Sequence, residues 1–216
     1  MKRILGLVLV LFVSAGFLVA LTLDDSTITV GVSFDTISAS GHSYEANASF
    51  GSKTSGGSAY LFYDVRWGQS NWFSRIGYEF ILLKGDYVFK DVSYGKDSGY
   101  GRSASKHRGG AYYSYMASKK VGFAIGVSFA EITMRMTDDS AGVKLTNSFI
   151  SIGLIADCQF YFTERFSARF SLNPDFIFLT LDRFQFNDGN YEMILSQAGF
   201  SSGYALGARV GLSYMF

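Results

Sequence analysis

Cysteine, proline and histidine are nearly absent from this sequence, which contains one cysteine, Cys158, one proline, Pro174, and two histidines in 216 residues. A single cysteine excludes an intramolecular disulfide, and so few thiols and imidazoles predict no metal cluster. The chain also lacks a charge excess, since its formal net charge is +1. It therefore has no basic field for binding nucleic acid, and we expect no cofactor.

Charged residues are missing from Ile4 to Leu23, an apolar run that follows two basic residues. A basic start and an apolar core are typical of a secretory signal peptide. We expect the signal peptide over residues 1–20, cleaved after Ala15 or Ala20, and a single domain over residues 24–216. The run is also long enough to be kept as a membrane anchor, but the strand-rich sequence after it favours export.

Aromatic residues and glycine are abundant, with 21 Phe, 14 Tyr and 24 Gly, a composition that suits strands and turns better than helices. In eight segments, apolar residues alternate with small or polar ones, and this period of two predicts β-strands. The expected strands cover residues 28–35, 59–67, 72–82, 111–118, 121–136, 150–162, 166–173 and 203–216.

The connections between these strands alternate between long and short. Residues 38–58, 84–110 and 138–147 are expected to be long loops, and residues 68–71, 119–120 and 163–165 to be tight turns. Residues 184–193, centred on Asp188-Gly189, predict a hairpin tip that extends the last two strands. The apolar phase slips by one residue near Glu131, which predicts a β-bulge there. A second bulge or a strand rim is expected at Pro174, which lacks the amide donor.

The final segment, residues 203–216, alternates throughout and ends on an aromatic residue. Arg209, Gly211, Tyr214 and Phe216 fill the pattern polar-x-Gly-x-x-aromatic-x-aromatic. This ending resembles the last strand of bacterial outer-membrane β-barrels, where it is the assembly signal. An ordinary edge strand that ends in Phe is the alternative interpretation.

With the signal peptide and the alternation, nearly the whole mature chain resembles the small barrels of the OmpX/OmpA/OmpW type. The resemblance implies an all-β protein, an eight-stranded antiparallel up-and-down transmembrane β-barrel integral to the cell outer membrane. It also implies insertion by the barrel-assembly machinery, contact with outer-membrane lipid and lipopolysaccharide, and a monomer.

Alternation alone does not say which face of the strands meets water, because a soluble lipocalin-type barrel alternates as well. Here the second face is mostly Gly, Ala and Ser with isolated charges of both signs, which suits a narrow lumen better than a solvated surface. The first face is bulky and apolar, which suits lipid. Buried charges require partners, so we expect a lumen charge network of Asp64, Arg66, Arg75, Glu79, Asp157, Arg169 and Arg209.

Aromatic residues cluster near the short turns, where an interfacial girdle should lie. The expected girdle comprises Trp67, Trp72, Phe162, Phe166 and Tyr214, with Phe216 beside it. Cys158 falls on the lipid face as a small apolar residue.

Few residues suggest catalysis. His42 and His107 lie near serines in expected external loops. Some eight-stranded barrels are lipid A acyltransferases or deacylases with such groups. His/Ser neighbours are, however, common by chance in Ser-rich loops. The expected loop 84–110 is also locally basic, with Lys96, Arg102, Lys106 and Arg108, which suits a solvated loop or contact with lipopolysaccharide phosphate.

We therefore expect a non-enzymatic surface protein whose long loops serve a membrane-structural, adhesion or host-interaction role. Two alternatives are a narrow channel for small hydrophobic compounds and a lipid A-modifying enzyme.

Overall fold

The computed structural model describes residues 26–43, 48–89, 92–94, 101–138, 143–187 and 192–216. These residues form nine strands: β1 (Ser26–Ser43), β2 (Ala48–Arg66), β3 (Trp72–Phe89), β4 (Val92–Tyr94), β5 (Gly101–Met116), β6 (Val121–Asp138), β7 (Val143–Tyr161), β8 (Phe166–Asn187) and β9 (Glu192–Met215). The expected signal peptide lies outside the described residues. No helix in the described part of the chain is long and apolar enough to cross a membrane.

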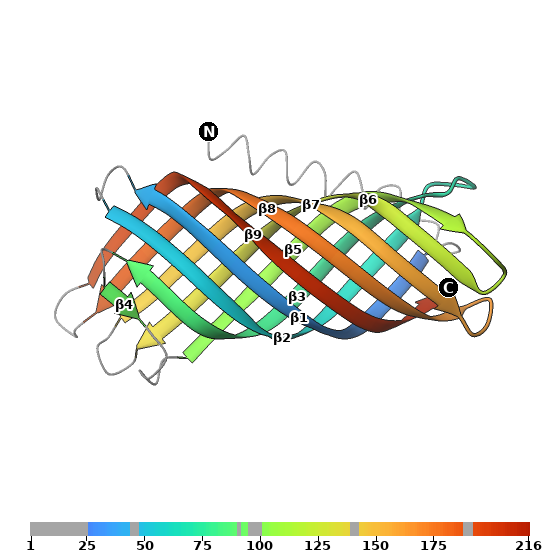
Figure 1. The fold of residues 1–216 in the computed structure, drawn as a ribbon, viewed down its shortest axis with the longest axis horizontal. Coiled ribbons are helices and arrows are strands. Elements are labelled where there is room, and N and C mark those ends of the chain that lie inside the picture. Colours follow the sequence, from blue (N-terminus) through green and yellow to red (C-terminus); the bar gives the residue numbers. More distant parts are fainter. Residues whose placement is uncertain (1–25, 44–47, 90–91, 95–100, 139–142, 188–191) are drawn as a thin grey trace.

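Eight long strands close into one antiparallel barrel (Figure 1). Each long strand pairs with the next along the chain, and β1 pairs with β9 to close the wall. The short strand β4 adds only to the far end of β3. The start of β1 and the end of β9 lie together at the end of the barrel that carries the short connections, where Thr27 pairs with Met215. The predicted eight-stranded up-and-down barrel is thus confirmed.

Three short connections define one end of the barrel, which we call the turn end. They cover residues 67–71, 117–120 and 162–165, and Gly68 adopts a positive φ of 54° in the first of them. The opposite end, where β4 lies in Figure 1, we call the distal end.

The strands run much further toward the distal end than the sequence predicts. The expected loops over residues 38–58, 84–110 and 138–147 are largely strand, because β1, β2, β3, β5 and β7 all extend into them. These extensions are rich in Ser and Gly and carry little apolar alternation, but backbone hydrogen bonds between neighbouring strands do not require it. The expected hairpin extension over 184–193 is present, since Asn187 pairs with Glu192; Asp188-Gly189 lies outside the described residues.

Along the middle of the barrel, the outer face is apolar and the inner face is small or charged. Outward residues such as Val32, Ile125 and Phe170 are exposed by 60%, 68% and 53%. The charged residues on the inner face of the strands are almost fully buried. Bulky apolar side chains that face outward from a closed barrel are stable only against lipid. The middle of the barrel is therefore a membrane-spanning wall.

Toward the distal end the polarity of the two faces is reversed. On β1, Ile37 and Ala39 are buried in the lumen, while the residues beside them are the outward Thr36, Ser38 and Ser40. Strands β5 and β6 repeat this pattern, whereas on β3, β8 and β9 outward residues such as Leu82, Phe176 and Tyr204 are still apolar and exposed. The inward residues at this end form one apolar cluster: Ile37, Ala39, Ile81, Leu83, Ala104, Ile132, Met134, Phe149, Ile177 and Ala205. Polar-out and apolar-in is the arrangement of a barrel in water. The strands thus continue beyond the membrane as a water-exposed extension with an apolar interior.

This reversal explains why the bulge predicted near Glu131 is wrong. The pairing of β6 with both of its neighbours continues through Glu131 without a register shift. The inward–outward alternation of the backbone is unbroken, and Ile132 and Met134 face the lumen, where they are exposed by only 0% and 3%. The apolar residues change face because the surroundings change from lipid to water.

The bulge or rim predicted at Pro174 is also misplaced. Pro174 lies within β8, and the register of β7 with β8 is the same on both sides of it. The shift occurs four residues later, where Ser151 pairs with Ile177 and Ile150 pairs with Leu179, which leaves Phe178 as the extra residue.

Candidate functional site

Two guanidinium groups and two carboxylates fill the lumen nearer the turn end, and we call them the turn-side charge cluster: Asp64, Arg75, Asp157 and Arg169. Arg75 donates from Nε to Asp64 Oδ1 at 2.7 Å and from Nη2 to Asp157 Oδ2 at 2.6 Å. Arg169 donates to the other oxygen of Asp64. Four different strands supply these side chains, so the ion pairs tie opposite walls of the barrel together.

Beyond this cluster, toward the distal end, the aromatic ring of Phe62 is fully buried in the lumen. The guanidinium carbon of Arg75 lies 4.8 Å from the ring centroid, and that of Arg209 lies 5.9 Å from it. Both distances are in the range of cation–π contacts. Gly77 makes room for the ring, because a Cβ at this position would lie 2.2 Å from the Phe62 Cδ1. Phe62 thus separates the turn-side cluster from a second set of charges.

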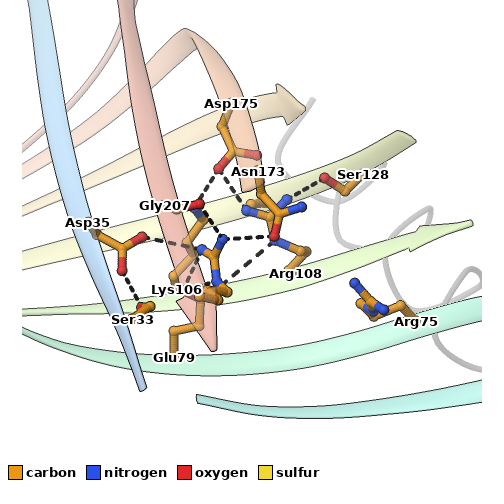
Figure 2. Close-up of polar contacts among 12 residues, drawn as sticks. Ser33, Asp35, Arg75, Glu79, Lys106, Arg108, Ser128, Asn173, Asp175 and Gly207 are labelled. Atoms are coloured by element: carbon orange, nitrogen blue, oxygen red, sulfur yellow. Dashed lines mark hydrogen bonds and ion pairs between the residues drawn. The ribbon is translucent and has the colours of Figure 1, made fainter. Parts of the chain in front are cut away.

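The second set, the central charge cluster, contains three carboxylates and three cationic groups: Asp35, Glu79, Lys106, Arg108, Asp175 and Arg209. Figure 2 shows these groups converging from several strands. Arg209 donates from Nη2 to Glu79 Oε2 at 2.6 Å and to Asp35 Oδ1 at 3.2 Å. Arg108 and Lys106 both donate to Asp175 Oδ2, the former at 2.7 Å.

Neutral polar groups complete the central cluster. Arg108 also donates from Nη1 to the Ser128 hydroxyl at 2.6 Å, and Arg209 donates from Nη1 to Asn173 Oδ1 at 2.7 Å. Positive and negative groups are equal in number in each cluster. The lumen therefore has no net field that would select for one sign of ion, and each charge is compensated where it is buried.

The structure brings six of the seven predicted lumen charges into these two clusters; Arg66 is placed elsewhere. Arg66 lies at the turn end, where its Nε donates to the Ser70 main-chain oxygen at 2.7 Å and its guanidinium lies 5.9 Å from the Phe73 ring centroid.

Four charged groups of the central cluster are not in the predicted network: Asp35, Lys106, Arg108 and Asp175. Lys106 and Arg108 were expected in a solvated loop. This is wrong, because both lie on β5 with their side chains buried, and their exposed fractions are only 0% and 2%. The outward residues beside them are Ser, His and Gly, so no apolar alternation marks the strand. Asp35 does lie in phase with the small, inward residues of β1, a signal that could have identified it.

The apolar cluster of the distal extension closes the lumen above the charges. Ile81, Ile132 and Phe149 are each 0% exposed. At the turn end a cavity of about 20 Å³ is lined by residues that include Thr27, Gln159, Ser167 and Arg169, which is room for about one water molecule. From the turn end outward, the lumen thus holds a small polar cavity, a charge cluster, an aromatic ring, a second charge cluster and an apolar layer.

Solved structures share this architecture. The chain aligns with neisserial surface protein A (NspA) at a TM-score of 0.55 and 10% identity, over 88% of this chain and 97% of that one. The outer-membrane protein OprG of Pseudomonas aeruginosa aligns at 0.54 and 9% identity, over 89% and 97%. A major outer-membrane protein of Thermus thermophilus aligns at 0.50 and 13% identity, over 86% and 99%. The fold is that of the small bacterial outer-membrane β-barrels. No protein-family model matches the sequence, and no curated protein matches it either.

The aromatic residues predicted as a girdle line the turn end of the barrel. Trp67 and Trp72 stack with ring centroids 6.2 Å apart, and Trp72 also contacts Tyr113 edge-on at 5.6 Å. The ring centroids of Phe162, in the β7–β8 connection, and Phe166, the first residue of β8, lie 5.7 Å apart. The five predicted girdle residues, which include Tyr214, and Tyr113 are all exposed, as expected of rings at a membrane–water interface. Tyr113 is an addition that the sequence pattern did not single out.

The residues predicted as the assembly signal lie on two faces of the final strand. Arg209 and Gly211 face the lumen, whereas Tyr214 and Phe216 face outward and contact each other edge-on at 5.2 Å. Gly211 borders Tyr60, whose hydroxyl oxygen would lie 2.3 Å from a Cβ at that position. In the folded barrel, Arg209 is thus a lumen residue of the central cluster as well as part of the C-terminal pattern.

The two histidines lie on strands and not in loops, contrary to prediction. His42 belongs to β1. His107 is exposed on the outer face of β5, where its ring lies 5.0 Å from that of Tyr78. Lys96, part of the expected basic loop, lies outside the described residues, and Arg102 is part of β5. Among the described residues, no group of three or more His, Cys, Asp or Glu side chains could hold a metal ion. Cys158 lies on the outer, lipid-facing side of β7.

Proposed function

We propose that this outer-membrane barrel is a sealed, rigid platform that acts through its exterior and its distal end and not through its lumen. The observation that carries the proposal is the continuous filling of the lumen. Phe62 and the residues of the two charge clusters are almost fully buried, and the apolar cluster closes the distal side. An eight-stranded barrel has an interior only wide enough for side chains, and here charged pairs and apolar side chains occupy it.

The ion pairs have a structural role in this proposal. They join strands on opposite walls, so they fix the register and resist flattening of the barrel. The distal extension then presents a stiff rim toward lipopolysaccharide or host surface molecules. The barrel functions as a monomer, inserted by the barrel-assembly machinery. This role requires no catalysis.

Conductance measurements test the sealed lumen. Purified protein reconstituted in planar lipid bilayers should give no unitary current steps in 1 M KCl, because no water-filled path crosses the apolar layer. A variant that removes the layer, Phe149→Ala with Ile81→Ala, is the matched comparison. Reproducible unitary steps from the wild-type protein would contradict the proposal.

The alternative function is a narrow channel for small hydrophobic compounds, and the observation in its favour is the apolar lining of the distal lumen. A compound that enters there meets six charged side chains of the central cluster. Uptake of a radiolabelled alkane or aromatic compound by liposomes that contain the barrel distinguishes the two functions. We expect uptake equal to that of protein-free liposomes.

A further inference from the structure

A serine, a histidine and a glutamate lie together on the outer face of strands β5 and β6. Ser105 and His107 are two residues apart on β5, and the residues that flank each of them are buried, so both side chains point outward. Glu131 also points outward and is the direct cross-strand partner of His107. Directly opposed side chains in an antiparallel pair have Cβ atoms about 5 Å apart, and residues two apart on a strand lie about 7 Å apart.

This combination is the one that nucleophilic acyl transfer requires. A serine hydroxyl becomes a useful nucleophile when an imidazole takes its proton, and a carboxylate beside the imidazole orients it and stabilises its charged form. We propose that Ser105, His107 and Glu131 form a lipid-facing site that hydrolyses acyl esters of membrane lipids, with Ser105 as nucleophile, His107 as general base and Glu131 as positioning residue.

The position of the three residues on the barrel fits this substrate. Toward the turn end, the next outward residue of β5 is Gly109, which lies between Ile76 on β3 and Phe129 on β6. A Cβ at Gly109 would meet no other atom within 4 Å, so the surface is low here and flanked by apolar side chains, as an acyl chain requires. Toward the distal end the outward residues are polar. The ester bonds of membrane lipids lie at this same boundary between acyl chains and headgroups.

A cation lies beside the nucleophile. Arg135 is the cross-strand partner of Ser103 and projects from the same outer face, one diagonal step from Ser105. Diagonal neighbours are about 7–8 Å apart, within reach of an arginine side chain. The guanidinium is placed to bind the oxyanion that develops on the ester carbonyl, or a phosphate of the lipid headgroup.

The imidazole of His107 has to turn for this reaction. It lies edge-on to Tyr78 of β3, across β5 from Glu131, with ring centroids 5.0 Å apart, so rotation about its own side-chain bonds has to bring it toward Ser105 and Glu131. Hydrogen bonds between a nucleophile and its base commonly tighten only when substrate is bound. The exposed position of His107 leaves room for this rotation.

The reaction balances without any further reagent. The Ser105 oxygen bonds to the ester carbonyl carbon while its proton passes to His107, and the carbon–oxygen bond to the lipid alcohol breaks as the alcohol takes that proton. Water then adds to the acyl-serine, loses a proton to His107 and displaces the serine oxygen, which takes the proton back. The products are a free fatty acid and the deacylated lipid.

Covalent labelling tests the site without knowledge of the natural lipid. Wild-type protein in dodecyl maltoside micelles is treated with a fluorophosphonate probe, and the labelled residue is found by mass spectrometry. We expect labelling at Ser105, loss of labelling in Ser105→Ala, and a decrease of about 10²–10⁴-fold in the labelling rate in His107→Asn. Ser55→Ala, which removes another outward serine on β2, is the matched control and should be labelled like the wild type.

Fatty-acid release identifies the lipid. Mixed micelles that contain dioleoylphosphatidylethanolamine in one arm and lipid A in the other separate a phospholipid from a glycolipid substrate, and wild-type protein should release fatty acid in at least one arm. Glu131→Gln should lower kcat with little change in KM, and Glu131→Asp should recover part of the loss. Heat-modifiable migration on unboiled gels confirms that each variant is folded.

The proposal is overturned if the labelling of wild-type protein equals that of Ser105→Ala, or if wild type and Ser105→Ala release fatty acid equally in both arms. Neither result affects the sealed lumen, because the site lies on the outer wall and conductance reports on the interior.

Discussion

Asn173 donates a hydrogen bond from Nδ2 to the main-chain oxygen of Leu154 at 3.2 Å. This carbonyl lies in the stretch of β7 that faces Pro174, where the pairing between β7 and β8 is interrupted. Proline has no amide hydrogen to donate, so the neighbouring side chain supplies the missing donor. The Oδ1 atom of the same side chain accepts a hydrogen bond from Arg209 Nη1 at 2.7 Å. Asn173 therefore links the β7 backbone opposite Pro174 to the central charge cluster.

Asn173→Ala should therefore destabilise the barrel by about 1–3 kcal/mol, since it leaves the Leu154 main-chain oxygen without its side-chain donor. It also removes one of the two acceptors of Arg209 Nη1, which keeps the Gly207 main-chain oxygen at 3.1 Å. Pro174→Ala restores a backbone donor, so the double variant should be destabilised by less than the sum of the two single changes. Urea unfolding in detergent micelles measures all three variants. Strict additivity would contradict the role assigned to Asn173.

Arg209→Leu should destabilise the barrel by about 3–5 kcal/mol, because it leaves the buried carboxylates of Glu79 and Asp35 without their shared cation. Arg165→Leu is the matched control, since Arg165 is exposed at the turn end and its loss should change the free energy of unfolding by about 0.5 kcal/mol or less. Equal stability of Arg209→Leu and the wild type would show that the ion pairs contribute little to stability.

Gly77→Ala should destabilise the barrel by about 1–3 kcal/mol, because its Cβ would collide with the ring of Phe62, which is fully buried. At Gly57, which is exposed, a Cβ would meet no atom within 4 Å, so Gly57→Ala should be close to neutral. The difference between the two variants, measured by thermal loss of the compact form on unboiled gels, tests the position of Phe62 in the lumen.

The reversal of polarity predicts where the wall leaves the membrane. Single cysteines are introduced at Ser38 and at Val127 in a Cys158→Ser background, and the protein is reconstituted in liposomes. A membrane-impermeant maleimide should label Ser38→Cys, which lies on the polar part of the outer face, and should not label Val127→Cys, which lies within the apolar band. Equal labelling of the two positions would contradict the assigned boundary.

Much of the fold follows from the sequence by itself. The alternation in residues 121–130 and 203–216 determines strands with two unlike faces, and the small residues and paired charges on one face determine that the apolar face is the outer one. Arg209 could be assigned to the lumen because it interrupts a run of small residues, and Arg75 and Glu79 because they lie on the face opposite the apolar residues Ile76, Tyr78 and Phe80.

The length of the strands and four of the six charged residues of the central cluster were decided by the tertiary structure. Lys106 and Arg108 lie on a strand whose outward residues are Ser, His and Gly, and such a strand carries no apolar period; only its pairing with β3 and β6 keeps it extended and turns the two cations inward. Likewise, Ile132 and Met134 shift the apolar phase with no change in the backbone. A sequence pattern reports which face is apolar, but only the closed barrel determines whether lipid, water or the lumen lies on that side.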